Sequence, residues 1–395
     1  MSFHPDIATI RSQFPALSRT ENGATAAYLD GPGGTQAPSL VIGAMSETLS
    51  NGVSNLGGGF GASIDAMEIT ERARQAMGRM LGAPPSTISF GQNMTSLTFS
   101  MSRSLAATWR PGEAVVVTSL DHDANYTPWV MAAHDSGVEV RTAEFDVATG
   151  LLDPSSVAAL LDERVRLVAV CLASNALGSV VDVAAISSAA HEVGASVYVD
   201  AVHAGPHLKM EVDVLECDFL AASAYKFFGP HTGILFGRPD QMASLDAYKV
   251  RPAPSDPPDK WETGTQSFES LAGVSAAVEY LESVGHDFIV TQETTLGRRF
   301  LDGISRMDHV RLYGPHSMED RVSTFAVSVD GRSPVEVAQR MAEAGIYVWA
   351  GHYYAVNVMD RLGVLDTGGL VRIGFVHYNT LDEVDRALDV LESLR

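Results

Sequence analysis

The chain has 395 residues, more than the roughly 100–200 of a typical domain, so we expect two lobes. Apolar residues make up 46% of the chain and charged residues 19%, which excludes a disordered or fibrous protein. The net charge of −21 argues against binding to nucleic acid or to a membrane surface, because both attract basic proteins.

Two cysteines, Cys171 and Cys217, exclude a disulfide framework and a four-cysteine metal site. The longest apolar run, residues 167–173, is far shorter than the roughly 20 residues that span a bilayer. The N-terminus lacks the charged and then apolar layout of a signal peptide. We therefore expect a soluble, cytoplasmic protein.

The first part of the chain predicts an arm and then a long helix. An amphipathic stretch at residues 7–14 and a short apolar run at 26–29 precede a glycine-rich turn at 30–35. Residues 64–81 keep one face apolar at helical spacing, which predicts a helix.

Beyond residue 110, predicted strands and helices alternate. Short apolar runs predict strands at residues 114–118, 165–173, 195–201, 218–222 and 233–237. Helical stretches lie at residues 127–136, 154–161 and 183–194. This alternation is typical of parallel βαβ units, in which helices cover both faces of the sheet.

The proline-rich run at residues 251–258 interrupts this alternation and predicts a domain boundary. The remainder predicts a smaller α+β lobe. Its expected helices and strands lie at residues 271–284, 321–330, 333–344, near Val371, and at 381–394.

Several common catalytic motifs are missing from the sequence. No glycine cluster matches G-x-G-x-x-G between a strand and a helix, which disfavours a dinucleotide-binding oxidoreductase. No H-E-x-x-H and no cysteine–histidine pair at zinc spacing occurs, so we expect no metal site. The hydrolase G-x-S-x-G and the phosphate-binding loop of NTPases are also missing.

Two charged residues follow predicted strands and point to a specific chemistry. Asp200 ends the run VYVD, and Lys226 lies in AYKFFGPHTG, which carries no other acidic or basic residue apart from its histidine. Ligands of open α/β sheets bind outside the carboxyl ends of strands, so both side chains can face one crevice. A carboxylate at a pyridine nitrogen and a lysine that forms an imine are what pyridoxal phosphate requires. Taken singly, each residue is more often structural, but this aromatic segment is an unusual place for a solvated lysine.

Longer motifs extend this pattern over nearly the whole chain, from Phe14 to the C-terminal helix. They are LDGPGGTQAP, DHDANYTPW, ASNALG, VYVDAVH, SAYKFFGPHTG, WETGTQ, the Gly351–His352 segment and VRIGFVHYNT. The sequence resembles the fold-type I pyridoxal-phosphate enzymes of the class V aminotransferase family, in particular the cysteine desulfurase-like branch.

The resemblance implies an α/β fold. It predicts an N-terminal arm (1–25) that packs with the small domain. A large cofactor-binding domain (26–255) with a mostly parallel sheet would follow, and then a small α+β domain (256–395). It also implies a homodimer with shared active sites.

The resemblance assigns roles by position. Lys226 would hold the pyridoxal 5′-phosphate aldehyde and Asp200 the ring nitrogen, while His203 would donate to the ring oxygen. The residues that it implies for the phosphate are Met94, Thr95, Ser223 and, from the partner subunit, Thr265. The other implied residues are Asn175 near the ring oxygen and the substrate carboxylate, Arg372 as the carboxylate clamp, and His352 at the substrate.

The sequence departs from the desulfurase pattern at three positions. Tyr354 stands where the family has its persulfide-forming cysteine, and we expect Cys171 and Cys217 to be buried and inert. Asp123 stands where a histidine stacks on the cofactor ring, so His122 or another group would have to cover it. Trp349 replaces an arginine that the family often has near the substrate.

The leading functional prediction is therefore a lyase acting on a small α-amino acid. It would break a Cβ–S or Cβ–Se bond by elimination without a persulfide, with Tyr354 either donating a proton or only packing. An aminotransferase or epimerase on the same scaffold is the alternative. A non-catalytic cofactor-binding paralogue is a third, which the presence of Lys226, Asp200 and Arg372 disfavours.

Overall fold

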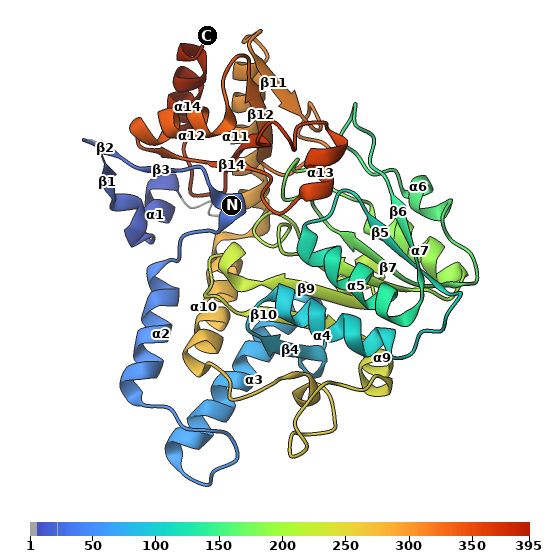
Figure 1. The fold of residues 1–395 in the computed structure, drawn as a ribbon. Coiled ribbons are helices and arrows are strands. Elements are labelled where there is room, and N and C mark those ends of the chain that lie inside the picture. The colour runs from blue at the N-terminus through green and yellow to red at the C-terminus, as the bar shows by residue number, and fades with distance from the viewer. Residues whose placement is uncertain (1–5, 22) are drawn as a thin grey trace.

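The computed structural model describes residues 6–21 and 23–395, and a large sheet forms the centre of the protein (Figure 1). In spatial order its strands are β4 (Ile88–Gly91), β10 (Gly233–Gly237), β9 (Phe219–Ser223), β8 (Ser196–Asp200), β7 (Val165–Cys171), β5 (Ala114–Thr118) and β6 (Glu139–Ala143). The five strands from β9 to β6 are parallel, and β10 is antiparallel to both of its neighbours. The mostly parallel α/β sheet confirms the predicted fold class.

Helices cover both faces of this sheet because its central strands are apolar on both sides. Along β5, Val115 and Val117 pack with one core cluster, whereas Val116 packs with another. The helices around the large sheet are α3 (Gly61–Leu81), α4 (Met94–Ala106), α5 (Thr127–Ser136), α6 (Pro154–Ala158), α7 (Val183–Glu192), α8 (Val212–Leu215), α9 (Pro239–Ser244) and α10 (Phe268–Val284).

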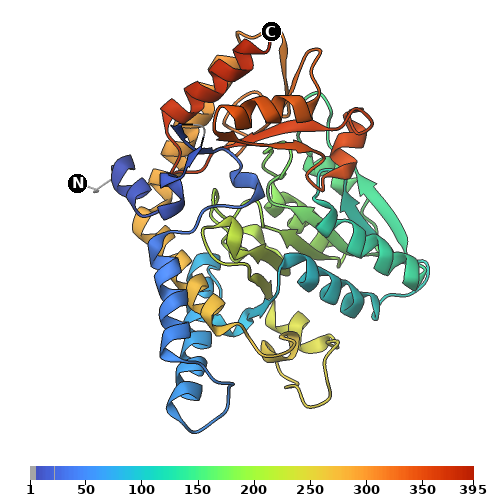
Figure 2. The ribbon, with the colours of Figure 1, turned by 60° about the vertical axis from the view of Figure 1, so that its left-hand side comes forward.

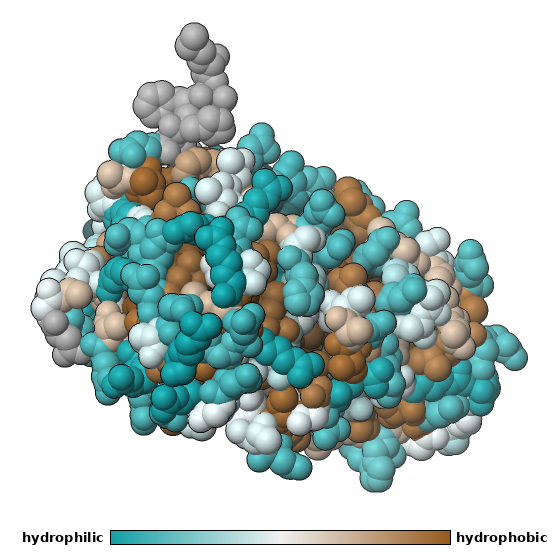
Figure 3. All heavy atoms as spheres, turned by 90° about the horizontal axis from the view of Figure 1, so that it is seen from above, coloured by the Kyte–Doolittle hydropathy of each residue, from teal (hydrophilic) through white to brown (hydrophobic). Residues whose placement is uncertain are grey.

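A second, antiparallel sheet follows in the C-terminal part of the chain. Its spatial order is β11 (Val310–Tyr313), β12 (Thr324–Val329), β15 (Leu370–Gly374) and β14 (Trp349–Gly351). It is accompanied by α11 (His286–Ile304), α12 (Pro334–Glu343), α13 (Val356–Arg361) and α14 (Leu381–Ser393). The end of the molecule around α14 and β11 is mostly hydrophilic, with apolar side chains scattered between polar ones (Figure 3).

The N-terminal segment lies beside this second sheet, as both ribbon views show (Figures 1 and 2). It contains α1 (Ile7–Ser12), β1 (Thr20–Glu21), β2 (Ala24–Thr25) and β3 (Ala27–Tyr28), and β3 pairs in parallel with β13 (Ile346–Tyr347). Arg11 forms an ion pair with the largely buried Glu383 of α14 at 2.9 Å.

The predicted domain boundary at residue 255 stays a prediction, because elements from either side of it pack against each other. Helix α10 comes after that boundary but packs against α2 (Ser39–Asn51) and α3. The strand expected at 321–330 begins only at Thr324, because Arg321 and Val322 bond instead with the turn at 178–179. None of the helices in the described part of the chain is long and apolar enough to cross a membrane.

Candidate active site

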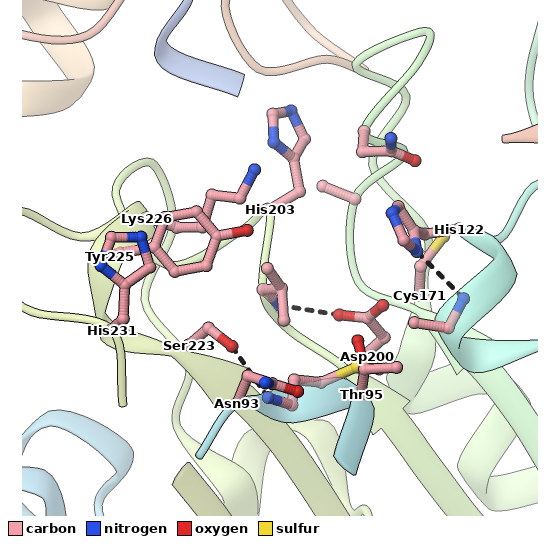
Figure 4. A pocket seen from close by; sticks show the side chains of 15 residues that line it. Asn93, Thr95, His122, Cys171, Asp200, His203, Ser223, Tyr225, Lys226 and His231 are labelled. Atoms are coloured by element: carbon pink, nitrogen blue, oxygen red, sulfur yellow. Dashed lines mark hydrogen bonds between the residues drawn. The ribbon is translucent and has the colours of Figure 1, made fainter. Parts of the chain in front are cut away.

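A cavity of about 510 Å³, here called the inner cavity, opens at the carboxyl ends of the parallel strands (Figure 4). This is where open α/β sheets bind their ligands. Its lining contains eight of the residues predicted for the site: Met94, Thr95, His122, Asn175, Asp200, His203, Ser223 and Lys226. The structure therefore brings together residues that lie as far as 132 positions apart in the sequence.

Lys226 lies in the short helical turn that follows β9 and is buried, with only 9% of its surface exposed. Its Nζ donates a hydrogen bond to the Pro32 carbonyl oxygen and lies 5.0 Å from the centre of the Tyr225 ring. Burial, together with the nearby Arg372 guanidinium, lowers the pKa of Lys226 to about 7. A large share of this amine is thus neutral, and so nucleophilic and basic, near neutral pH.

Asp200 ends β8, and its carboxylate also enters the inner cavity (Figure 4). Its Oδ1 accepts a hydrogen bond from the Val202 backbone N–H at 2.9 Å. Burial raises the pKa of Asp200 to about 6, although the Lys226 ammonium opposes the shift. A cationic ring nitrogen beside this carboxylate would favour its charged form.

Two of the imidazoles that line the inner cavity, His203 and His122, were predicted for the site. His203 is buried, and its Nε2 lies 3.0 Å from the Thr324 hydroxyl oxygen; burial lowers its pKa well below the ordinary value. The Nδ1 of His122 accepts the Ala124 N–H at 3.0 Å, and burial lowers the pKa of His122 to about 4. Both rings are therefore neutral at neutral pH and can each donate one hydrogen bond.

The N-terminus of α4 borders the inner cavity. The Met94 N–H donates to the Ser223 hydroxyl at 3.0 Å, and the Asn93 side chain caps the helix by accepting the Ser96 N–H at 2.9 Å. Gly233 permits this close approach, because a Cβ there would come within 2.5 Å of the Asn93 backbone. A helix N-terminus flanked by hydroxyl groups favours a phosphate, as predicted for this segment.

A second cavity of about 640 Å³, here called the outer cavity, adjoins the inner one and shares Thr95, His122, Asn175 and Lys226 with it. It brings in the predicted Arg372, together with His352 and Tyr354 from the loop after β14. The outer cavity therefore joins the predicted cofactor and substrate residues in one space.

Arg372 lines the outer cavity and is buried. The side chain is 5% exposed, donates from Nη1 to the Asn175 carbonyl at 2.9 Å and lies 4.5 Å from the centre of the Tyr353 ring. Burial lowers its pKa to about 10, so it stays charged at neutral pH. Its Nε and the nearby Asn175 Oδ1 are buried without a hydrogen-bond partner among the described residues. The Arg372 Nε–H can donate to a carboxylate, whereas the Asn175 Oδ1 can only accept from a donor such as an ammonium group.

The loop that carries Tyr353 and Tyr354 is strained. Both residues are in the left-handed region, with φ of 51° and 58°, which bulky side chains rarely adopt. The Tyr354 carbonyl accepts the Asp123 N–H at 2.7 Å, and its ring stacks near His122 at 5.6 Å between centroids. The Tyr354 side chain is 67% exposed at the entrance.

Thr265 is the one predicted cofactor residue that lines neither cavity. It is exposed and lines a separate hollow of the same chain with Gln92, Ser96 and His231. Only His231 belongs to both this hollow and the inner cavity. The role assigned to Thr265 across a subunit interface stays a prediction.

Both cysteines are free and buried, as expected. Cys217 is fully buried, lines neither cavity, and burial raises its pKa to about 12. Cys171 lines the inner cavity, but burial and the nearby Asp121 and Asp200 raise its pKa well above the usual value. Neither thiol is set up to ionise.

Three further residues of the site were missed by the sequence reasoning. Tyr225 lines both cavities and stacks on His231, with ring centroids 4.9 Å apart. Both flank Lys226 in the segment AYKFFGPH, so their proximity to it was a usable signal. Asp30 is largely buried near Lys226 and Arg372, and burial raises its pKa to about 6. Its place in a glycine-rich turn gave no such signal.

The donor set of the inner cavity fits pyridoxal 5′-phosphate. It offers a helix N-terminus with hydroxyl groups for a phosphate, a buried carboxylate at Asp200 and a buried amine with a lowered pKa at Lys226. In the described part of the chain, no group of three or more histidine, cysteine, aspartate or glutamate side chains could hold a metal ion.

Comparison with known proteins agrees with this geometry. The family model "Aminotransferase class-V" matches residues 27–387. The chain is 32% identical to "Probable cysteine desulfurase 2" of Mycobacterium leprae, over 96% of this chain and 94% of that protein. It is 31% identical to the "Cysteine desulfurase" of Dickeya dadantii, over 97% and 95% of the two chains. It spans 65% of the length of another relative, "Probable cysteine desulfurase 1" of M. leprae.

Solved structures give the same result. The apo structure of a cysteine desulfurase from Thermococcus onnurineus matches with a TM-score of 0.91 and 28% identity, covering 100% of this chain and 99% of the other. The cysteine desulfurase CsdA from Escherichia coli matches with a TM-score of 0.88 and 26% identity, covering 98% of both chains.

Proposed function

The chain belongs to the class-V aminotransferase family and is a pyridoxal-phosphate-dependent enzyme, and we propose that it breaks a Cβ–S or Cβ–Se bond of a small α-amino acid by elimination. One observation favours elimination over persulfide chemistry. Tyr354 stands where the family resemblance places the nucleophilic cysteine, and the two cysteines of the chain are buried with raised pKa values. Only a thiolate is nucleophilic enough to take up sulfur as a persulfide.

The overall reaction balances without an oxidant. A cysteine thioether and one water molecule give a thiol, pyruvate and ammonium. The Cα–H bond breaks and its proton is removed, and the Cβ–S bond breaks with its electron pair leaving on sulfur, which takes one proton. When bound, pyridoxal 5′-phosphate supplies the electron sink that makes the Cα proton acidic.

Three residues of this chain bind the substrate carboxylate, accept the Cα proton and keep the ring nitrogen charged. Arg372 binds the substrate carboxylate, because its planar fork suits a bidentate pair and its Nε is buried without another partner among the described residues. Lys226, neutral in part near pH 7, accepts the Cα proton. Asp200 holds a positive charge on the ring nitrogen, which keeps the ring electron-poor.

Tyr354 is the candidate for the proton donated to the leaving sulfur. Its phenol lies at the entrance of the outer cavity, beside His122 and Asp123. The strained backbone of the loop supports a functional role, because such strain of roughly 1–3 kcal/mol per residue is typically found at active sites. His122, one residue before the expected position, is the best-placed group to cover the cofactor ring.

A homodimer with shared sites completes the proposal. Thr265 is exposed and does not line the inner cavity of its own chain, so we assign it to the phosphate site of the partner subunit. Large apolar side chains are exposed on α2, the following loop and α3: Leu40, Ile42, Leu49, Val53, Leu56, Phe60, Ile64 and Met67. A second copy of the chain would cover this apolar row, which is the pattern of an isologous interface.

Product analysis tests the reaction type. The holoenzyme is incubated with L-cysteine and with S-alkyl cysteines, and the three-carbon product is identified. Pyruvate in equal amount to the released thiol or sulfide supports elimination. Alanine as the three-carbon product indicates desulfuration, and transfer of the amino group to an added 2-oxo acid indicates an aminotransferase; either result contradicts the proposal.

A further inference from the structure

The outer cavity carries an apolar lining that the proposed reaction does not by itself require. Phe99 of α4, Pro128 of α5 and Trp349 of β14 lie along it, together with the ring of Tyr354. A free thiol on the substrate would leave most of this lining, in a cavity of about 640 Å³, without contact. The lining therefore indicates a larger substituent on the substrate.

Trp349 lies next to the residue that binds the substrate carboxylate. It is the direct partner of Arg372 in the antiparallel pair of β14 and β15, so both side chains project from the same face of the sheet. The indole also packs against Gly33, where a Cβ would come within 2.6 Å of Nε1. This contact places one edge of the indole beside the carboxylate site, while Trp349 as a whole is 54% exposed.

The charges of the outer cavity disfavour an anionic substituent. Arg372 and Lys226 are the only arginine and lysine among the described residues that line it, and both already have roles. Asp123 is the carboxylate of the lining, and its Oδ1 accepts the Thr127 hydroxyl at 2.9 Å. Apart from the imidazoles of His122 and His352, a second negative charge on the substrate would thus meet aromatic rings and a carboxylate, with no further arginine or lysine of the lining to pair with it.

We propose that Trp349 and Phe99 bind an uncharged apolar or aromatic substituent on the substrate sulfur. The preferred substrates are then S-alkyl and S-aryl cysteine conjugates rather than free cysteine or anionic thioethers. This inference rests on the proposed function, and it adds the substrate class. Aromatic stacking and apolar burial favour such a group.

Kinetics on the holoenzyme test the inference directly. The value of kcat/KM for S-benzyl-L-cysteine is expected to exceed that for S-carboxymethyl-L-cysteine by about tenfold or more. Trp349→Arg should bring this ratio to one or below, whereas the matched variant Trp349→Phe should retain it. Equal values in the wild-type enzyme, or a ratio that Trp349→Arg leaves unchanged, would overturn the inference.

Binding of two unreactive probes separates this inference from the reaction itself. 3-(Benzylthio)propanoate and 3-(carboxymethylthio)propanoate lack the α-amino group, and calorimetry gives their affinities for the holoenzyme. The benzyl probe should bind about tenfold more tightly, and Trp349→Arg should remove the difference. Selective binding without thiol release would support the apolar site while the lyase proposal fails. Equal affinities would contradict the apolar site even if the lyase is active.

Discussion

Cys171 and Asp200 lie directly opposite each other on the neighbouring parallel strands β7 and β8. The Cys171 thiol is the one cysteine side chain that lines the inner cavity, and burial together with two nearby carboxylates, Asp121 and Asp200, raises its pKa. A thiolate at this place would be desolvated and repelled. The cysteine nearest to the chemistry is thus held as a neutral thiol.

Lys226 is expected to be the residue that binds the cofactor covalently. Borohydride treatment of the holoenzyme should fix a pyridoxyl group on Lys226, found by peptide mass spectrometry. In the apoenzyme the rate of cofactor attachment should rise with pH through about 7 and then level, because the neutral amine is the reactive form. A rate that keeps rising towards pH 10, or a label on another lysine, would contradict the assignment.

The same pKa predicts how the stability of the apoenzyme depends on pH. Lys226 has a folded pKa of about 7 and an ordinary value of 10.5 in the unfolded chain, so the unfolded chain binds more protons between these values. The free energy of unfolding contributed by this group therefore rises with pH from about 7 to 10.5. Urea titrations of the apoenzyme should show this rise, and Lys226→Met should flatten it.

Asp200→Ala should retain some cofactor but lose turnover by at least about 10²-fold. The ring nitrogen loses the partner that keeps it protonated, while the residues around the α4 N-terminus still bind the phosphate. Visible absorbance measures the bound cofactor, and thiol release measures turnover. Asp200→Glu serves as the control that keeps the charge. Wild-type turnover in Asp200→Ala would remove this residue from the mechanism.

Tyr354→Phe should slow elimination by about tenfold, and by up to about 10²-fold with basic leaving thiols. Because Tyr354 is largely exposed, water can replace part of its role, and folding stability should change by less than about 0.5 kcal/mol. The test compares kcat for cysteine thioethers whose leaving thiols differ in pKa. If every substrate keeps its wild-type kcat in Tyr354→Phe, the phenol does not donate the proton and the ring has only a packing role.

The apolar row on α2 and α3 predicts a dimer that a charge can disrupt. Phe60 is 57% exposed and Leu49 60%, so aspartate at either position should leave the fold intact but weaken association. Sedimentation at several protein concentrations should show a dimer for the wild-type protein and monomer for the variants.

Val214→Asp is the matched control, since Val214 is 64% exposed on α8, away from this row. It should remain dimeric. The monomeric variants should also bind the cofactor more weakly if Thr265 completes the partner's phosphate site. A wild-type monomer with full activity would contradict the shared site.

Five of the seven strands of the large sheet were predictable because each is a short apolar run, whereas β4 has only four residues and β6 (EVRTA) is largely polar, so neither was predicted. Asp200 and Lys226 were predictable for the same reason, since Asp200 ends such a run and Lys226 comes three residues after another. Helix α2 was not predicted. Its exposed apolar residues, such as Leu40 and Leu49, interrupt the polar face by which an amphipathic helix is recognised in a sequence.

The contacts between segments far apart in the sequence could not be predicted from local sequence patterns. Trp349 and Arg372 become neighbours only through strand pairing, and Asp30 approaches Lys226 only when the N-terminal turn folds over the cavity. The left-handed backbone of Tyr353 and Tyr354 was likewise unexpected, because no glycine marks it. Such strain is set by the surrounding structure and not by the local sequence.

In the proposed reaction the sulfur leaves the substrate as a free thiol and is never bound covalently to the protein. The most direct test is intact-protein mass spectrometry during turnover of L-cysteine and of a cysteine thioether, on the wild-type enzyme and on the Cys171→Ser/Cys217→Ser double variant. We predict no added sulfur on the wild-type chain and most of the wild-type turnover in the double variant. A persulfide on Cys171 or Cys217 during turnover, lost together with activity in the double variant, would contradict the account.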